Sequence, residues 1–265
     1  MFAAQLVLHA AAWRVARTRR VCHDNGAVAG PAVRLWTVAR ETILALLVLV
    51  LWPLGAMPAR ASRLRAVVLV HGFALSPASL WLLASRLRRD GWAVSVPRLG
   101  GWWRDLGDAA DRLAAHLDRV RHEHGAANVV VVAYGLGGLA SRLLLLRAGR
   151  HAGIRLLVTL GTPHGGTAAC AWLRCGPFRD EVRPGSDVLR TLAAARLPRR
   201  LEAIAIASPD DALIVPADGG HWSDACNISV EGSGHLHLLV SARVHGIIAE
   251  NLGVVLESEF RRHGE

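Results

Sequence analysis

The chain alternates between short apolar runs and longer segments in which apolar residues recur every three or four positions. The short runs, rich in Val and Ile, predict buried β-strands, and the periodic segments predict amphipathic helices. Strands that alternate with helices form a parallel sheet covered on both faces. We expect strands at 67–70, 92–96, 129–132, 154–160, 203–207 and 227–230, and helices at 79–89, 105–123, 186–194 and about 242–256.

One strand leads into a Gly-rich turn. The valine run at 129–132 is followed by AYGLGGL and then by an apolar helical pattern. A strand, a tight turn and a helix are the setting of the nucleophile elbow, G-x-S-x-G, and Ala133 and Gly137 supply the small residues that it needs. The centre of the motif is Gly135, not serine. A plain turn is one alternative. A phosphate-binding loop is another, but neither G-x-G-x-x-G nor a GK[ST] ending is present.

Composition narrows the possible functions. The 265 residues suit one α/β domain with an appendage, and the net charge of +10 comes from Arg alone, because the sequence contains no Lys. The Arg residues are scattered among acids without a basic stripe, so we do not expect nucleic-acid binding. The four cysteines lack zinc spacing. Cys170 and Cys175 either pair in an oxidising compartment or are inert core thiols.

The N-terminal region, 1–62, carries two apolar stretches. Residues 1–16 are too short to span a bilayer confidently and suit an interfacial helix. The stretch at about 35–57 is apolar without interruption from 43 to 51, and its only charged residues, Arg40 and Glu41, stand near its start. Leu and Val on every face of a helix are typical of a membrane span, so we expect an anchor here. A buried core helix is the alternative.

Arg residues are more numerous before this stretch than after it. The positive-inside rule therefore places the N-terminus in the cytoplasm and the large domain on the extracytoplasmic side of an inner membrane. The sequence Ala59-Arg60-Ala61 is similar to a signal-peptidase site, so release by cleavage is the alternative.

Four motifs in the domain at 63–265 occur in an order that is typical of one fold. They are HGF at 71–73, the Gly-rich turn, TLGTPHGG at 159–166, and GHL at 234–236 before the last helix. In this order they resemble the α/β-hydrolase fold, and within it the bacterial lipases and esterases. The resemblance implies a mostly parallel sheet with helices on both faces and a lid-like insertion at about 167–200. It also implies an acyl ester or lipid ligand and neither metal nor cofactor, and it names no protein partner.

The resemblance also assigns site residues. The backbone N–H groups of Phe73 and Leu136 would form the oxyanion hole, which stabilises the charged oxygen of a tetrahedral intermediate. In that motif set His71, Gly72, Gly137 and His164 are structural positions rather than catalytic ones.

The acid and base follow in chain order. Asp211 matches the acid of a D-x-x-V/I-x-P loop, with Asp210 as the runner-up, and His235 matches the base. An Asp after Ser-Pro also suits a plain turn. Rival histidines stand at His164, His221 and His237.

The departure from the family lies at Gly135, because glycine has no group that forms an acyl-enzyme. Three neighbouring positions, 133–135, differ together from the usual Gly-His-Ser, which favours natural divergence over an engineered serine knockout. Backbone donors of the oxyanion hole would survive this change. Substitute serines at Ser76, Ser79 and Ser141 are not placed to face both His235 and the hole.

Three functions therefore compete. The first is a degenerate lipase or esterase homologue, a pseudoenzyme that binds acyl or lipid esters. The second is a weak hydrolase in which His235 activates a water lodged at Gly135. The third is a membrane-anchored interaction protein whose pocket is filled.

Overall fold

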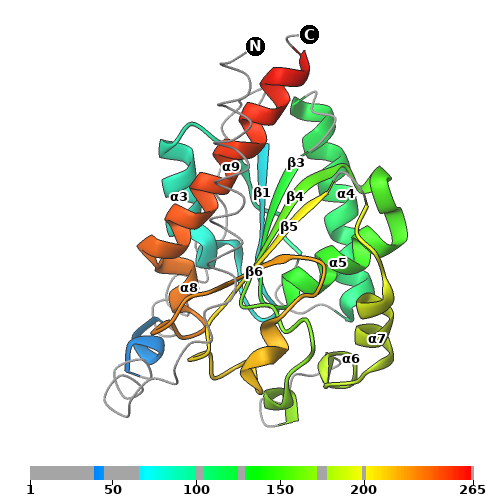
Figure 1. Ribbon diagram of the computed structural model, residues 1–265, viewed down its shortest axis with the longest axis vertical. Helices are drawn as coiled ribbons and strands as arrows, with labels where there is room; N and C mark the ends of the chain where they lie inside the picture. The colour runs from blue at the N-terminus through cyan, green and yellow to red at the C-terminus, as the bar shows by residue number, and fades with distance from the viewer. Residues whose placement is uncertain are drawn as a thin grey trace, which may run out of the picture.

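A parallel sheet forms the centre of the molecule. The computed structural model describes residues 39–44, 66–99, 104–124, 129–171, 178–198 and 201–263. Six strands pair in the order β2-β1-β3-β4-β5-β6, and every pairing is parallel (Figure 1). The strands are β1 (Ala66–Val70), β2 (Ala93–Ser95), β3 (Val129–Tyr134), β4 (Ile154–Leu160), β5 (Glu202–Ala207) and β6 (Cys226–Ser229). The predicted parallel sheet is confirmed.

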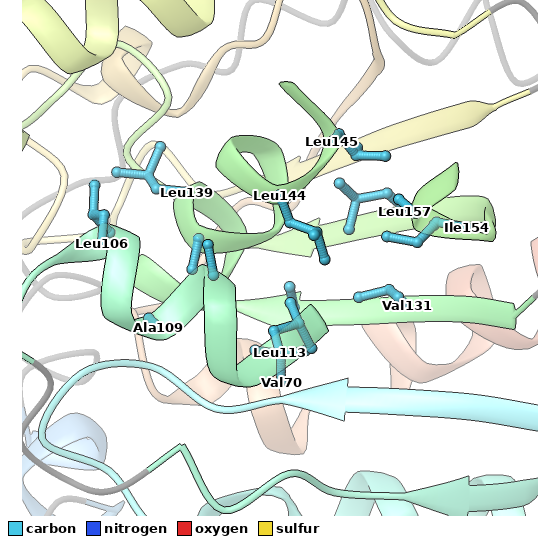
Figure 2. Packing of buried hydrophobic residues seen from close by; sticks show 14 of the residues in the cluster. Val70, Leu106, Ala109, Leu113, Val131, Leu139, Leu144, Leu145, Ile154 and Leu157 are labelled. Atoms are coloured by element: carbon cyan, nitrogen blue, oxygen red, sulfur yellow. The ribbon is translucent and has the colours of Figure 1, made fainter. Parts of the chain in front are cut away.

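Helices cover both faces of this sheet (Figure 1). One face packs against α3 (Trp81–Arg89), α8 (His237–Val240) and α9 (Ala242–His263). The other packs against α4 (Leu106–His124), α5 (Leu136–Ala148) and α7 (Asp187–Ala194), with the short α6 (Arg179–Val182) before α7. Successive strand residues face opposite layers, so Val70 and Val131 meet Leu113 of α4 in the core that Figure 2 shows.

The strand order reverses between β1 and β3. From β1 the chain passes to β2 on one side and then returns to β3 on the other. In open parallel sheets such a reversal leaves a crevice outside the carboxyl ends of the two strands, where ligands bind. His71 follows β1 and Gly135 follows β3, so both lie at that position.

Two glycines let α5 begin against the sheet. A Cβ atom at Gly137 would lie 2.7 Å from the carbonyl oxygen of His71, and one at Gly138 would lie 2.0 Å from Oγ1 of Thr162. No side chain fits at those distances. The sequence Gly-Gly after the elbow is therefore a packing requirement.

The segment at 167–200 belongs in part to the core. Its predicted helix is present as α7, where Oγ of Ser186 accepts a hydrogen bond from the N–H of Leu189 at 3.2 Å. Leu189 and Leu192 are buried in the cluster that α4 and α5 share. Residues 172–177 and 199–200 lie outside the described residues, so a lid over the site stays a prediction.

The N-terminal region is described only at 39–44, which are helical. The rest of the predicted anchor at about 35–57, the stretch 1–16 and the cleavage sequence at 59–61 lie outside the described residues. In the part of the chain that the structure describes, no helix has both the length and the apolar character to cross a membrane.

Candidate active site

Gly135 occupies a sharp turn between β3 and α5. Its backbone has φ 55° and ψ −129°, a conformation that residues other than glycine rarely adopt. Its N–H donates to the carbonyl of Leu160 at 2.9 Å, and its own carbonyl accepts from Oγ1 of Thr162 at 2.9 Å. The end of β4 therefore holds the turn in place. This geometry is that of a nucleophile elbow.

Asp211 and His235 form a buried pair. Oδ2 of Asp211 lies 2.6 Å from Nδ1 of His235, and Oδ1 accepts from the N–H of Leu213 at 2.8 Å. The carboxylate is fully buried, while 13% of the His235 side chain is exposed. Since Nδ1 faces the carboxylate, Nε2 is the nitrogen left to act on a ligand. The contact that the sequence predicted is present.

The groups around His235 shift the pKa of its imidazole. Burial lowers the pKa of the imidazole, but the charge of Asp211, the hydrogen bond to it and the charge of Glu41 together raise that pKa above its ordinary value. The ring lies 4.8 Å, centroid to centroid, from the ring of Tyr134. Burial, and then the charges of Asp211 and Glu41, raise the pKa of Tyr134, so its hydroxyl stays protonated and supplies no phenolate.

Nε2 of His235 faces the space beside Gly135. A Cβ atom built on Gly135 would lie 3.6 Å from this nitrogen and 3.8 Å from Cα of Gly72. Apart from its chain neighbours, no other heavy atom of the described residues would lie within 4 Å of it. The geometry therefore leaves room for a small group between the turn and the imidazole.

Two turns that flank Gly135 carry Phe73 and Leu136, the residues predicted to form the oxyanion hole. Leu136 is the first residue of α5, where N–H groups have no acceptor within the helix and carry the positive end of its dipole. Phe73 lies in a turn that the N–H of Leu75 closes on the carbonyl of Gly72 at 3.3 Å. A Cβ atom at Gly72 would lie 3.2 Å from the Tyr134 ring, so this turn packs against the elbow.

Solved structures share this arrangement of elements. The mature Bacillus licheniformis lipase BlEst2 superposes with a TM-score of 0.59 at 16% identity, over 75% of this chain and 96% of that one. The chain has the α/β-hydrolase fold. Aspergillus fumigatus lipase B gives a TM-score of 0.58 at 16% identity over 69% of this chain, which spans only about half of that lipase, 52%.

The likeness extends to a third α/β-hydrolase. The thioesterase domain from the curacin biosynthetic pathway matches with a TM-score of 0.51 at 15% identity, over 73% of this chain and 93% of that domain. At these identities the likeness shows the fold alone. No protein-family model and no curated protein matches the sequence.

The alternative acid Asp210 and the alternative histidine His237 have other side-chain partners. Oδ2 of Asp210 accepts from the N–H of Gly232 at 2.7 Å and so holds the loop that carries His235. Nδ1 of His237 lies 3.1 Å from Oγ of Ser233. His221 follows the short helix at Ala217–Gly220, and its N–H donates to the carbonyl of Asp218 at 2.9 Å.

His164 has structural contacts. Its Nε2 lies 2.9 Å from Oγ1 of Thr159, and its Nδ1 lies 3.1 Å from Nη1 of Arg142. Burial first, then the charge of Arg142, lowers the pKa of this imidazole, which therefore stays neutral. The residue therefore links Thr159 of β4 to Arg142 of α5.

The candidate substitute serines do not reach the imidazole. Oγ of Ser141 donates to the carbonyl of Gly137 at 2.8 Å within α5, and Oγ of Ser79 donates to the carbonyl of Ser76 at 2.8 Å. Among the described residues, no serine hydroxyl is hydrogen-bonded to His235.

Sequence reasoning missed one residue at this site. Both carboxylate oxygens of Glu41 accept hydrogen bonds from the loop that follows His235. The one signal available was a pair of charges, Arg40 and Glu41, at the start of a stretch that otherwise predicts a membrane helix.

Proposed function

We propose that this chain is a lipase- or esterase-like α/β-hydrolase homologue that binds acyl or lipid esters and has lost most of its catalytic power. One observation carries the proposal. Nε2 of His235, held by Asp211, faces the turn at Gly135 across a distance that suits a serine hydroxyl, yet residue 135 has no side chain. The site thus combines a general base with backbone donors and lacks only the attacking group.

Each retained part has a chemical role. An ester carbonyl seated between the N–H groups of Phe73 and Leu136 would be polarised, because those donors stabilise the oxyanion that develops on attack. Asp211 would fix the tautomer of His235 and stabilise its charged form. Gly135 is the position of the missing nucleophile, so no acyl-enzyme forms. Losing the nucleophile of a triad costs about 10⁶ in turnover, which leaves roughly 10³–10⁴ over water.

A weak water-dependent hydrolase is the second candidate. The open space beside Gly135 favours it, because a water placed there would lie next to Nε2 of His235. The imidazole would take one proton from the water while the oxygen attacks the ester carbon. The same proton would then pass to the leaving alkoxide, which gives an acid and an alcohol.

The pH dependence of this route follows from the base. Only neutral imidazole accepts a proton, and the pKa of His235 is raised by Asp211 and Glu41. Turnover by this route should therefore fall as the pH drops through that raised pKa, and reach its plateau above it.

Direct measurement on the native chain separates these functions. We expect it to bind methyl ketones of short and long acyl chains, which keep the carbonyl but have no leaving group. We also expect it to release little or no product from p-nitrophenyl esters of the same chain lengths. The matched control is His235→Ala, which should still bind the ketones.

Each other outcome selects a different function. Ester turnover that disappears in His235→Ala would establish the water route. No binding of any ketone would overturn the proposal and favour the third candidate, an interaction protein with a filled pocket. The membrane anchor, and with it a domain on the extracytoplasmic side of an inner membrane, is a separate proposal that rests on the sequence alone.

A further inference from the structure

The short N-terminal helical segment at 39–44 is joined to the loop that carries His235. Nη2 of Arg40 donates to the carbonyl of Gly232 at 2.6 Å, on one side of the histidine. On the other side, Oε2 of Glu41 accepts from the N–H of Leu236 at 2.6 Å, and Oε1 accepts from the N–H of His237 at 2.9 Å. Almost 200 residues of sequence separate these partners, so the contact is tertiary.

Gly234 permits this contact. A Cβ atom there would lie 2.3 Å from Cδ of Glu41 and 2.5 Å from its Oε1, and the three nearest atoms all belong to that side chain. The φ angle of Gly234 lies outside the left-handed region. Glycine is therefore needed at this position for the approach of Glu41 and not for an unusual backbone conformation.

The contact places charge where it acts on the site. Hydrogen bonds from backbone N–H groups to a carboxylate are about twice as strong as those between neutral groups. The two N–H groups belong to the N-cap residue and the first residue of α8 and have no acceptor within that short helix, so Glu41 satisfies both. The same charge raises the pKa of His235, after Asp211.

We propose that Glu41 is a positioning residue of the active site, by which the N-terminal segment clamps the loop of His235 and adds a second carboxylate to its surroundings. The proposal rests on the proposed function only in taking His235 as the base. Asp211 from the acid loop and Glu41 from the N-terminal segment act on this imidazole by their charge, and the ring of Tyr134 from β3 lies beside it. Arg40 and His237 are the charged and titratable groups on the adjoining segments, where they contact Gly232 and Ser233.

A merely structural cap on α8 would make the same hydrogen bonds, so the test must report on His235 itself. We would measure the pKa of His235 by NMR in the full chain with Gly135 unchanged, assigning its signal by its loss in His235→Gln. The first variant is Glu41→Gln, which removes the charge and keeps one acceptor oxygen. The second is Gly234→Ala, which displaces the carboxylate without altering it.

The matched control is Glu202→Gln. Glu202 is a half-exposed carboxylate that pairs with Arg155 at 3.4 Å. It stands at the amino-terminal end of β5, whereas the site lies at the carboxyl ends of the strands. This variant removes the same charge from the same kind of side chain. It should leave the titration of His235 unchanged.

We expect Glu41→Gln and Gly234→Ala each to lower the pKa of His235, because a negative charge near the imidazole is lost. The double variant should show no further shift, because both changes remove one interaction. A His235 pKa in Glu41→Gln that equals that of Glu202→Gln would overturn the proposal. If Gly234→Ala does not fold, Glu41→Gln alone decides the question.

The result is independent of ester turnover. If the chain neither binds nor hydrolyses esters, but Glu41→Gln shifts the pKa of His235, the proposed function is contradicted and the positioning role of Glu41 is supported. A chain that binds esters without that shift would do the reverse.

Discussion

At the scale of single residues, Gly135 is the position on which the proposed function depends. Glycine adopts the conformation of this turn at little cost, whereas a side chain there would store about 1–3 kcal/mol of strain. In an active hydrolase the serine has to bear that strain for the sake of catalysis. With Gly135 the fold keeps its turn and its His-Asp pair without that strain.

Tyr134, next to this glycine, gives a prediction about stability. Its side chain is buried, and in the described part of the chain its hydroxyl has no hydrogen-bond partner. A buried hydroxyl without a partner costs about 1–3 kcal/mol. Tyr134→Phe should therefore raise the free energy of unfolding by about 1 kcal/mol, measured by urea titration. A loss of stability would instead show that the hydroxyl has a partner.

The contact between Asp211 and His235 was predictable from the sequence, because a motif fixes both positions. Asp211 was preferred to Asp210 on motif position, and the structure pairs Asp211 with His235. Glu41 was not predictable, because no periodicity in the sequence connects residue 41 with residues 236 and 237.

Among the elements, α5 begins close against the end of β1. Its first turn passes the carbonyl of His71 at a distance that only glycine allows. This contact brings the N–H of Leu136 beside the turn of Gly72. A larger residue at Gly137 would push the helix away from the oxyanion loop.

A pair of Gly→Ala variants tests this packing. Gly137→Ala should destabilise the protein by about 1–3 kcal/mol, because the new methyl group overlaps backbone that cannot move aside. Gly246→Ala, on the exposed side of α9, has open space and should stabilise it by up to about 1 kcal/mol. Thermal unfolding of both variants measures the contrast. Equal effects would contradict the packing argument.

Element boundaries were predictable to within about two residues where apolar periodicity was strong, as for β4 and α4. The four-residue helices α6 and α8 were missed, because one helical turn has no measurable period. The last helix continues to His263, past the predicted end near 256, since its charged final turns no longer show an apolar face.

For the whole molecule, the alternation of strands and helices predicts a parallel sheet but not the order of its strands. In the observed order β1 and β3 are neighbours, which brings the two motifs at 71–73 and 133–137 together at the carboxyl ends of these strands. The strand order could not be predicted from the sequence, because pairing between distant strands leaves no local pattern.

Membrane attachment is the prediction that concerns the whole chain. If the apolar run at 43–51 lies within a spanning helix, the full chain should fractionate with membranes and resist carbonate extraction. Replacing three of its leucines by Asp should release it, since each charge at a helix centre costs about 2.5–3.5 kcal/mol. A full chain that is soluble without detergent would show that no anchor exists.

The most direct test of the central claim is the esterase activity of Gly135→Ser on p-nitrophenyl esters. If the base and the oxyanion donors are intact, the new hydroxyl lies beside Nε2 of His235, and we predict a rate at least about a hundredfold above that of the native chain. Gly135→Ala, which bears the same strain without a hydroxyl, and Gly135→Ser/His235→Ala should show no gain. A folded Gly135→Ser protein without activity on any chain length would contradict the account.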